Sequence, residues 1–248
     1  MSAAEVELRP LSQLEQFQRC VELQKLIWGF DDVDIVPLRL FVVASKVGGQ
    51  VFGAFDSNQM IGFVMAIPGY RHGRSYLHSH MAAVLPDYQG QGIGRRLKLL
   101  QREDALARGM DLIEWTFDPL AFRNAHFNIE RLGAIMRRYV HNQYGRTSSP
   151  LHGGLPTDRL VAEWWLKAPR VEAAVRGERV PHPADAQRIH VPQRIHELKT
   201  TDLPAAEKLQ TEVREQFEQW LGRGFAVVGF EHSDTGGTYL LEPYQEPR

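Results

Sequence analysis

Residues 76–96, YLHSHMAAVLPDYQGQGIGRR, decide the fold of this chain. Residues 77–85 are apolar enough to form a buried strand, which Pro86 and Asp87 end. A glycine-rich loop at 89–94 follows, and a helical pattern begins near Gly92. Glycines let a ligand approach backbone N–H groups closely, and at a helix N-terminus these donors act together with the helix dipole. The stretch therefore predicts an anion site, with a phosphate or pyrophosphate as its ligand.

The glycine spacing distinguishes between families of phosphate-binding loops. A Walker loop requires Gly-Lys-Ser/Thr, which the sequence lacks. The dinucleotide motif requires a glycine three residues after Gly92, where Arg95 stands. The run Gln89-x-x-Gly92-x-Gly94 instead resembles the Q/R-x-x-G-x-G/A signature of the GNAT superfamily of acyl-CoA N-acyltransferases. The phrases HSHMAAVLPDYQGQGIG, TFDP and RLGA also resemble an uncharacterised bacterial subgroup whose members carry a C-terminal extension.

The resemblance covers roughly residues 5–168 and implies the fold class. It implies an α/β (α+β) GNAT fold, in which helices flank a mixed, mostly antiparallel central sheet. We expect an N-acyltransferase domain at 1–170, a linker at 171–193 and a small C-terminal β-α-β-β unit at 194–248. The linker prediction rests on charge, prolines and weak hydrophobic periodicity after Pro169.

Hydrophobic periodicity and turn residues predict the individual elements. The predicted strands are 6–9, 50–55, 60–67, 77–85, 111–117, 134–139, 160–166, 194–198, 225–231 and 238–242. The predicted helices are 13–28, 37–47, 93–108, 122–132 and 203–221. Ser12 is expected to cap the first helix and Gly29 to end it, while Asp56-Ser57-Asn58 predicts a hairpin.

Composition excludes several classes of function. The hydrophobic fraction of 43% is ample for a core, and a net charge of −1 gives no reason to expect nucleic-acid or membrane binding. The single Cys20 excludes an intramolecular disulfide. It lies in an amphipathic helix pattern and is expected to be a core residue rather than a nucleophile. The first residues lack a signal-peptide pattern, so we expect a cytoplasmic protein. No CxxC or HExxH spacing occurs, and we expect no metal.

The resemblance implies acetyl-CoA or another acyl-CoA as co-substrate. Backbone N–H groups of the glycine loop would hold its pyrophosphate. The main chain of Ala83 and Val84, in the strand before the loop, would pair with its pantetheine arm. The N–H near Val84 is the family's usual oxyanion donor. Phe122 stands where the family carries an asparagine, so Asn124 is expected to reach the pantetheine, with Phe127 packing on it. The expected CoA-binding residues are Ala83, Val84, Gln89, Gln91, Gly92, Ile93, Gly94, Arg95, Asn124 and Phe127.

His78 and His80 are the candidate catalytic bases. Residues two apart on a strand share a face, and that face is expected to carry Ala82 and Val84 as well. Imidazole titrates near neutral pH, which suits a base that removes a proton from an ammonium. The HSHMAAV run is similar to the HxHxxAV run of arylalkylamine N-acetyltransferases, where the two histidines form a proton route. The alternative is that both histidines are structural residues of the core.

The position of the acid that would protonate the leaving thiolate holds a different residue from that of the family. Many members carry tyrosine four residues before the glycine at Gly133, where this chain has Ile129. Tyr139 or Tyr144 can take that role from the following strand and loop, or can serve only in packing. The thiolate can also leave unprotonated, because a thiol pKa near 8.5 makes it a tolerable leaving group.

The acceptor is expected to be a primary amine of a small molecule, such as an amino-acid-like compound, and a homodimer is a further expectation. Arginines at the pocket mouth would favour a carboxylate-bearing acceptor or acyl group such as succinyl. Candidates for the mouth are Trp28, Phe30, Arg71, His72, Arg74 and Arg123. The alternative function is a CoA-binding or sensing module without catalysis. A nicotinamide-dependent oxidoreductase is disfavoured, because Glu114 lies mid-strand and the glycine spacing differs.

Overall fold

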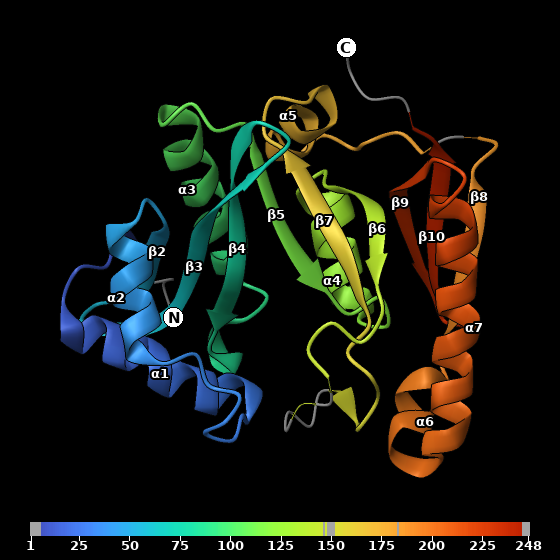
Figure 1. Cartoon of the computed structure of the whole chain (residues 1–248), viewed down its shortest axis with the longest axis horizontal. Coiled ribbons are helices and arrows are strands. Elements are labelled where there is room, and N and C mark those ends of the chain that lie inside the picture. Colours follow the sequence, from blue (N-terminus) through green and yellow to red (C-terminus); the bar gives the residue numbers. More distant parts are fainter. Residues whose placement is uncertain (1–5, 146, 148–151, 183, 245–248) are drawn as a thin grey trace. The chain divides into compact units, whose positions relative to one another are not determined.

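The computed structural model describes residues 6–145, 147, 152–182 and 184–244 (Figure 1). These residues form two compact units, and the boundary lies between Glu114 and Trp115, inside strand β5 (Leu112–Phe117). Each unit combines helices with mostly antiparallel strands, so the predicted α/β (α+β) class is confirmed. No helix in these ranges is long and apolar enough to cross a membrane.

The first unit is built on an antiparallel ladder of four strands. These are β1 (Glu7–Pro10), β2 (Gln50–Asp56), β3 (Gln59–Arg71) and β4 (Arg74–Val84), paired in that order. The start of β5 runs parallel to β4, with Leu77 opposite Ile113 and His78 opposite Glu114. The predicted hairpin is confirmed, because a two-residue turn in which Ser57 has a positive φ of 54° joins β2 to β3.

Three helices accompany this ladder: α1 (Leu14–Trp28), α2 (Leu38–Lys46) and α3 (Ile93–Ala107). Helix α1 ends at Gly29, whose φ of 63° is the left-handed conformation predicted for this position. The prediction that Ser12 caps α1 is wrong. The N-cap is Gln13, and the Gln16 side chain accepts hydrogen bonds from the backbone N–H groups of Ser12 and Gln13, at 3.0 and 3.1 Å.

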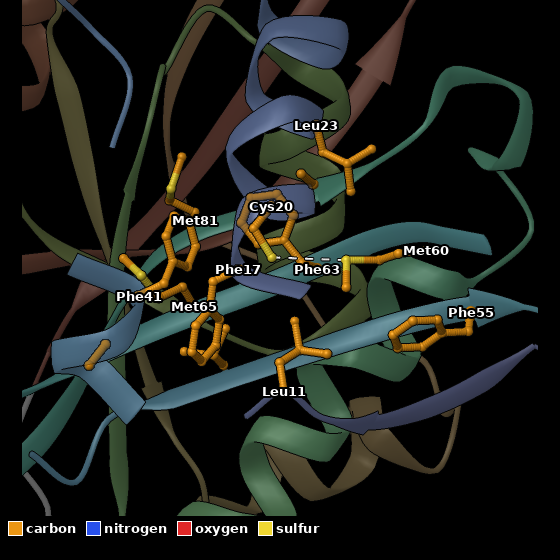
Figure 2. Close-up of a cluster of buried hydrophobic side chains, with 13 residues drawn as sticks. Leu11, Phe17, Cys20, Leu23, Phe41, Phe55, Met60, Phe63, Met65 and Met81 are labelled. Atoms are coloured by element: carbon orange, nitrogen blue, oxygen red, sulfur yellow. Dashed lines mark hydrogen bonds between the residues drawn. The ribbon is translucent and has the colours of Figure 1, made fainter. Parts of the chain in front are cut away.

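The helices cover opposite faces of the ladder, because alternate strand residues point to opposite sides. On one face α1 and α2 pack against the strands, and we call this set the α1/α2 cluster (Figure 2). Its buried residues are Leu11, Phe17, Cys20, Leu23, Phe41, Ala44, Val51, Phe55, Met60, Phe63, Met65, Met81 and Ala83. On the other face α3 packs against the strands, and we call this set the α3 cluster. Its buried residues are Phe52, Ala54, Ile61, Val64, Ile93 and Leu97. Cys20 is buried in the first cluster, with its Sγ 3.9 Å from the Met60 sulfur.

The second unit contains the rest of β5 and ten further elements. They are α4 (Phe122–His126), the π-helical turn η2 (Phe127–Arg131), β6 (Ile135–Val140), β7 (Arg159–Trp165), α5 (Pro169–Val175), β8 (Gln187–Pro192), α6 (Ile195–Thr201), α7 (Leu203–Leu221), β9 (Phe225–Ser233) and β10 (Gly236–Pro243). Its strands lie in the order β7-β6-β9-β10-β8, and β9 joins β6 with Met136 opposite Val227.

Two element predictions in this unit are wrong. The stretch 194–198, expected as a strand, lies in α6, and the expected linker contains α5 and β8. The tetrapeptide QRIH occurs at both 187–190 and 193–196, and the strand forms on the first copy. There a β-branched valine and Pro192 follow, whereas the second copy runs into Glu, Leu and Lys, which favour helix. The division into domain, linker and extension stays a prediction.

Phe63 tests the α1/α2 cluster. Its ring is fully buried, 5.7 Å from the Phe41 ring and 6.4 Å from the Trp28 ring. We expect Phe63→Ala to lower the free energy of unfolding by about 3–5 kcal/mol, because it removes buried contacts and leaves a cavity. Urea unfolding of Val33→Ala, at an 88% exposed position, is the control and should match the unaltered chain. A loss below about 1 kcal/mol for Phe63→Ala contradicts this packing.

Candidate active site

Strand β4 carries one residue more than the strand it pairs with. Met81 lies opposite Met65, and Ser79 lies opposite Ala66, so His80 is the extra residue of a β-bulge. A bulge disrupts the ladder locally and re-aims the side chains around it. The candidate base therefore occupies a specialised backbone position that the sequence alone did not reveal.

The bulge exchanges the faces of β4. Ser79 contacts side chains of α3, whereas Met81 packs in the α1/α2 cluster (Figure 2), although strict alternation would place both on one side. After the bulge, Ala83 packs in the α1/α2 cluster and Val84 against the α3 cluster. The prediction that His78 and His80 share a face with Val84 is therefore wrong, because the extra residue shifts the alternation by one.

The two imidazoles do lie side by side. Their ring centroids are 6.1 Å apart, and both side chains are half-buried. His78 is opposite Ile67, which packs against the α1/α2 cluster, so both rings lie on that face. Burial lowers the pKa of His80 below its ordinary value of 6.5. His80 is therefore neutral at pH 7 and able to accept a proton.

A buried carboxylate accompanies the histidines. Glu114 is opposite His78 in the parallel register and forms an ion pair with the Arg71 guanidinium, which lies 5.1 Å from the centre of the Tyr76 ring. Sequence reasoning placed Arg71 among the acceptor-side candidates but gave Glu114 no role on this face. In the sequence, Glu114 stands out as an acidic residue inside an apolar strand. That it lies opposite His78 follows only from the register between β4 and β5.

The loop after β4 has the geometry of an anion site. The 3₁₀ turn η1 (Pro86–Tyr88) leads into Gly90 and Gly92, whose φ angles are 82° and 80°. Gly92 caps α3, and the first-turn N–H groups of a helix have no acceptor within the helix. The side chains of Gln89 and Gln91 bond within the loop, to the carbonyls of Val84 and Asp87. These glutamines therefore brace the loop while its backbone supplies the donors.

The other residues predicted in this loop have different environments. Ile93 is buried in the α3 cluster and anchors the helix start. Gly94 has open space where a Cβ would be, and Arg95 is half-buried in the first turn. Their contact with a pyrophosphate stays a prediction.

One edge of β4 faces away from β3 at Val84. The N–H of Leu85 donates to the carbonyl of Ile61 at 2.8 Å, so by alternation the peptide groups of Val84 point to the opposite edge. Within residues 6–114, no strand pairs with that edge beyond His78. This is the edge that an extended pantetheine would extend by strand-like pairing. Ala83 is buried, and its predicted pairing with pantetheine remains untested.

The remaining site predictions fall in the second unit. Asn124 is exposed on α4, and Phe127 is half-buried at the start of η2. Ile129, at the family's tyrosine position, is completely buried. Tyr139 donates its hydroxyl to Asp158 at 2.8 Å, and burial raises its pKa far above 10, so it is a poor acid. Tyr144 is exposed, with its hydroxyl 3.2 Å from Thr116 Oγ1.

The residues predicted at the mouth of the acceptor pocket fall in both units. Trp28 and Phe30 form a ring pair with centroids 5.5 Å apart at the end of α1, and His72 and Arg74 are exposed at the β3–β4 turn. Arg123 is exposed on α4. Among the described residues, no group of three His, Cys, Asp or Glu side chains is placed to hold a metal ion.

Comparison with known proteins agrees with this geometry. Residues 47–133 match the family model described as the acetyltransferase (GNAT) domain, a span that includes β4, the glycine loop and α3. No curated protein compared with the sequence matches it.

Several solved structures have a similar fold. A putative GNAT-family acetyltransferase from Desulfovibrio desulfuricans is 15% identical, with a TM-score of 0.53, over 65% of this chain and 99% of that chain. Smu.2055 from Streptococcus mutans is also 15% identical, with a TM-score of 0.54 and the same coverage. The ribosomal-protein-S18-alanine N-acetyltransferase of Escherichia coli is 17% identical, with a TM-score of 0.51, over 66% of this chain and 95% of its own.

The similar structures are matched almost whole, and about a third of this chain lies outside the match. At these identities the likeness shows the fold, and the predicted GNAT fold is confirmed. Together with the family model it supports acyl transfer from acyl-CoA in general. The chain thus has the GNAT fold, and residues 47–133, about a third of its length, match the acetyltransferase (GNAT) domain.

Proposed function

We propose that the chain transfers an acetyl group, or another short acyl group such as succinyl, from acyl-CoA to a primary amine by direct attack in a ternary complex. The observation that carries this proposal is the neutral, half-buried His80, held in the bulge of β4 beside His78. A base that is uncharged at neutral pH can take the proton that an ammonium must lose before its nitrogen attacks. His80 is the proposed base, and His78 relays the proton toward solvent.

The reaction needs few further groups from the protein. The amine nitrogen attacks the thioester carbonyl carbon, the C–S bond breaks and CoA leaves as the thiolate. The attacking nitrogen, positively charged after it has bonded to carbon, releases its second proton to solvent. Backbone N–H groups of the loop at 91–95 hold the pyrophosphate, and edge N–H groups of β4 near Val84 stabilise the developing oxyanion. The thiolate leaves without an acid at the family's tyrosine position, because Ile129 there is a buried core residue.

We propose a small-molecule amine, such as an amino-acid-like compound, as the acceptor. Exposed Arg74 at the β3–β4 turn supports an acceptor that carries a carboxylate beside its amine. Similar structures include an enzyme named for ribosomal-protein-S18 alanine and the NatC complex bound to Gag peptide and CoA, which is 18% identical with a TM-score of 0.50. A screen of acceptors should therefore include peptides with free N-termini beside amino acids and arylalkylamines.

A CoA-binding or sensing module without catalysis is the second candidate. The buried Ile129 favours it, because the family's acid is missing at that position. It predicts that acetyl-CoA and CoA bind, while no amine or peptide of the panel releases free thiol. We propose a cytoplasmic location for either function.

His80→Ala tests the proposed base. We expect kcat to fall by about 10²–10⁴, while the Kd for acetyl-CoA, measured by calorimetry, stays unchanged. Because burial lowers the His80 pKa, the rate of the unaltered chain should fall only as the pH drops below 6.5, and this acidic limb should vanish in the variant. His190→Ala, at an exposed position of β8, is the control. An equal rate in His80→Ala and His190→Ala removes His80 from the mechanism.

Gly92→Ala tests the anion site, and Gly73→Ala is its matched control. Both glycines have positive φ, 80° and 75°, and no atom within 4 Å of an added Cβ, so alanine introduces similar backbone strain at each. Acetyl-CoA at 100 times its Kd should stabilise the unaltered chain and Gly73→Ala by roughly 2.7 kcal/mol. Gly92→Ala should weaken binding at least about tenfold, because moving the loop misaligns its N–H donors.

Thermal unfolding with acetyl-CoA, succinyl-CoA and NADH measures this effect. A melting temperature that no CoA compound raises in the unaltered chain contradicts the proposed CoA site. Equal stabilisation of the two glycine variants shows instead that Gly92 is only a turn residue.

A further inference from the structure

A buried polar cluster lies on the opposite side of β4 from the histidines. The Lys98 ammonium donates to Ser79 Oγ at 2.7 Å, and the Ser79 hydroxyl donates to Gln101 Oε1 at 3.0 Å. All three side chains are buried, and Lys98 is only 3% exposed. We call these three residues the Ser79 clamp, because two residues one turn apart on α3 hold one hydroxyl of the strand.

The clamp continues into β2. Gln50 Nε2 donates to the carbonyl of Gln101 at 2.9 Å and to Asp104 Oδ2 at 2.7 Å. Gln101 Nε2 and Gln50 Oε1 have no hydrogen-bond partner among the described residues, although both are buried. Apolar side chains at these positions would avoid that desolvation cost, so simple core packing does not account for the choice of residues.

Burial lowers the pKa of Lys98 to about 7, far below its ordinary 10.5. The unfolded chain therefore binds more protons between pH 7 and 10.5, and Lys98 destabilises the fold most at or below pH 7. We expect Lys98→Met to raise the melting temperature at pH 7, with a gain over the unaltered chain that shrinks as the pH rises to 10. Differential scanning calorimetry measures it, and a gain that grows with pH contradicts the burial of a lysine here.

The clamp holds the residue next to the bulge. Ser79 must face α3 and Met81 must face the α1/α2 cluster for His80 to be the unpaired residue between them. A shift of one residue in register sends each side chain of a strand to the other face. The two hydrogen bonds between Ser79 and α3, one accepted from Lys98 and one donated to Gln101, oppose that shift. The N-cap of the same helix is Gly92 in the glycine loop, so α3 contributes both to the clamp and to the proposed CoA site.

We propose that Lys98 and Gln101 are positioning residues, which hold Ser79 on the α3 face and thereby keep the His80 imidazole in its half-buried place beside His78. This role rests on the proposed function, because it matters to the reaction only if His80 is the base. It assigns a task to a buried lysine whose ammonium donates to Ser79.

Histidine-ring NMR of the full chain tests the clamp without needing an acceptor. His80→Gln identifies the His80 signal, whose pKa is then measured in Lys98→Met and Ser79→Ala. We expect the His80 pKa to rise toward about 6.5 in both variants, because the ring leaves its buried position. Ser79→Thr keeps the hydroxyl and should restore the lowered value. Lys46→Met, at an exposed position of α2, is the matched control and should titrate like the unaltered chain.

Steady-state kinetics with acetyl-CoA and the best amine of the panel provide the second measurement. We expect kcat to fall at least about tenfold in Lys98→Met and Ser79→Ala, because a catalytic group displaced by about 1 Å loses up to about 10²-fold. KM for acetyl-CoA should stay within about twofold, since the loop donors remain. A purely structural role predicts no separation of kcat from KM.

The outcomes separate the clamp from the proposed function. An unchanged His80 pKa in both folded variants overturns the clamp, whatever the rates. A shifted pKa in both variants, together with restoration by Ser79→Thr, supports it. If that shift occurs while the unaltered chain transfers acetyl to no amine, the clamp stands and the acetyltransferase proposal falls. If Lys98→Met does not fold, Ser79→Ala alone decides between these results.

Discussion

Strand β4 has one residue more than β3 where the two strands pair, and the organisation of the first unit depends on this extra residue. A regular ladder would continue the alternation of β4 unbroken from Leu77 to Val84. The extra residue at His80 instead places Ser79 and Met81 on opposite sides. Residues before and after the bulge can then fill both clusters, while His80 itself has no cross-strand partner. A strand whose other buried side chains pack in the two clusters thus has one position that a reactive side chain can occupy.

Several buried or half-buried polar groups of the first unit lie near this bulge. On the α1/α2 face lie the two imidazoles and the Glu114–Arg71 ion pair, and on the α3 face lies the Ser79 clamp. Burying such groups is costly unless each finds a partner. Apolar clusters on both faces fix the backbone firmly enough for these partners to meet, so packing energy supports the polar arrangement. This is why the site is built on a strand rather than on the loop.

In the second unit, the same short sequence adopts different secondary structure in different surroundings. The two QRIH segments are identical, yet one forms strand β8 and the other begins helix α6. Pairing with β10 selects the first copy, where Ile189 and Val191 are both fully buried. Ile129 is a similar case, since the family resemblance predicts an acid at its position and the residue lies here in the core. Local resemblance does not determine a role when burial decides the environment.

The sequence by itself determined the glycine loop, the helix that follows it, the paired histidines and the α/β class. These features depend on local chemistry, namely glycine at positive φ, an alternating apolar strand and a helix N-terminus. Only the tertiary structure decided the bulge at His80, the faces of Ala83 and Val84, the Glu114 neighbour and the Ser79 clamp. Each of these depends on register between segments far apart in the chain, and a single inserted residue changes that register without leaving a local signal.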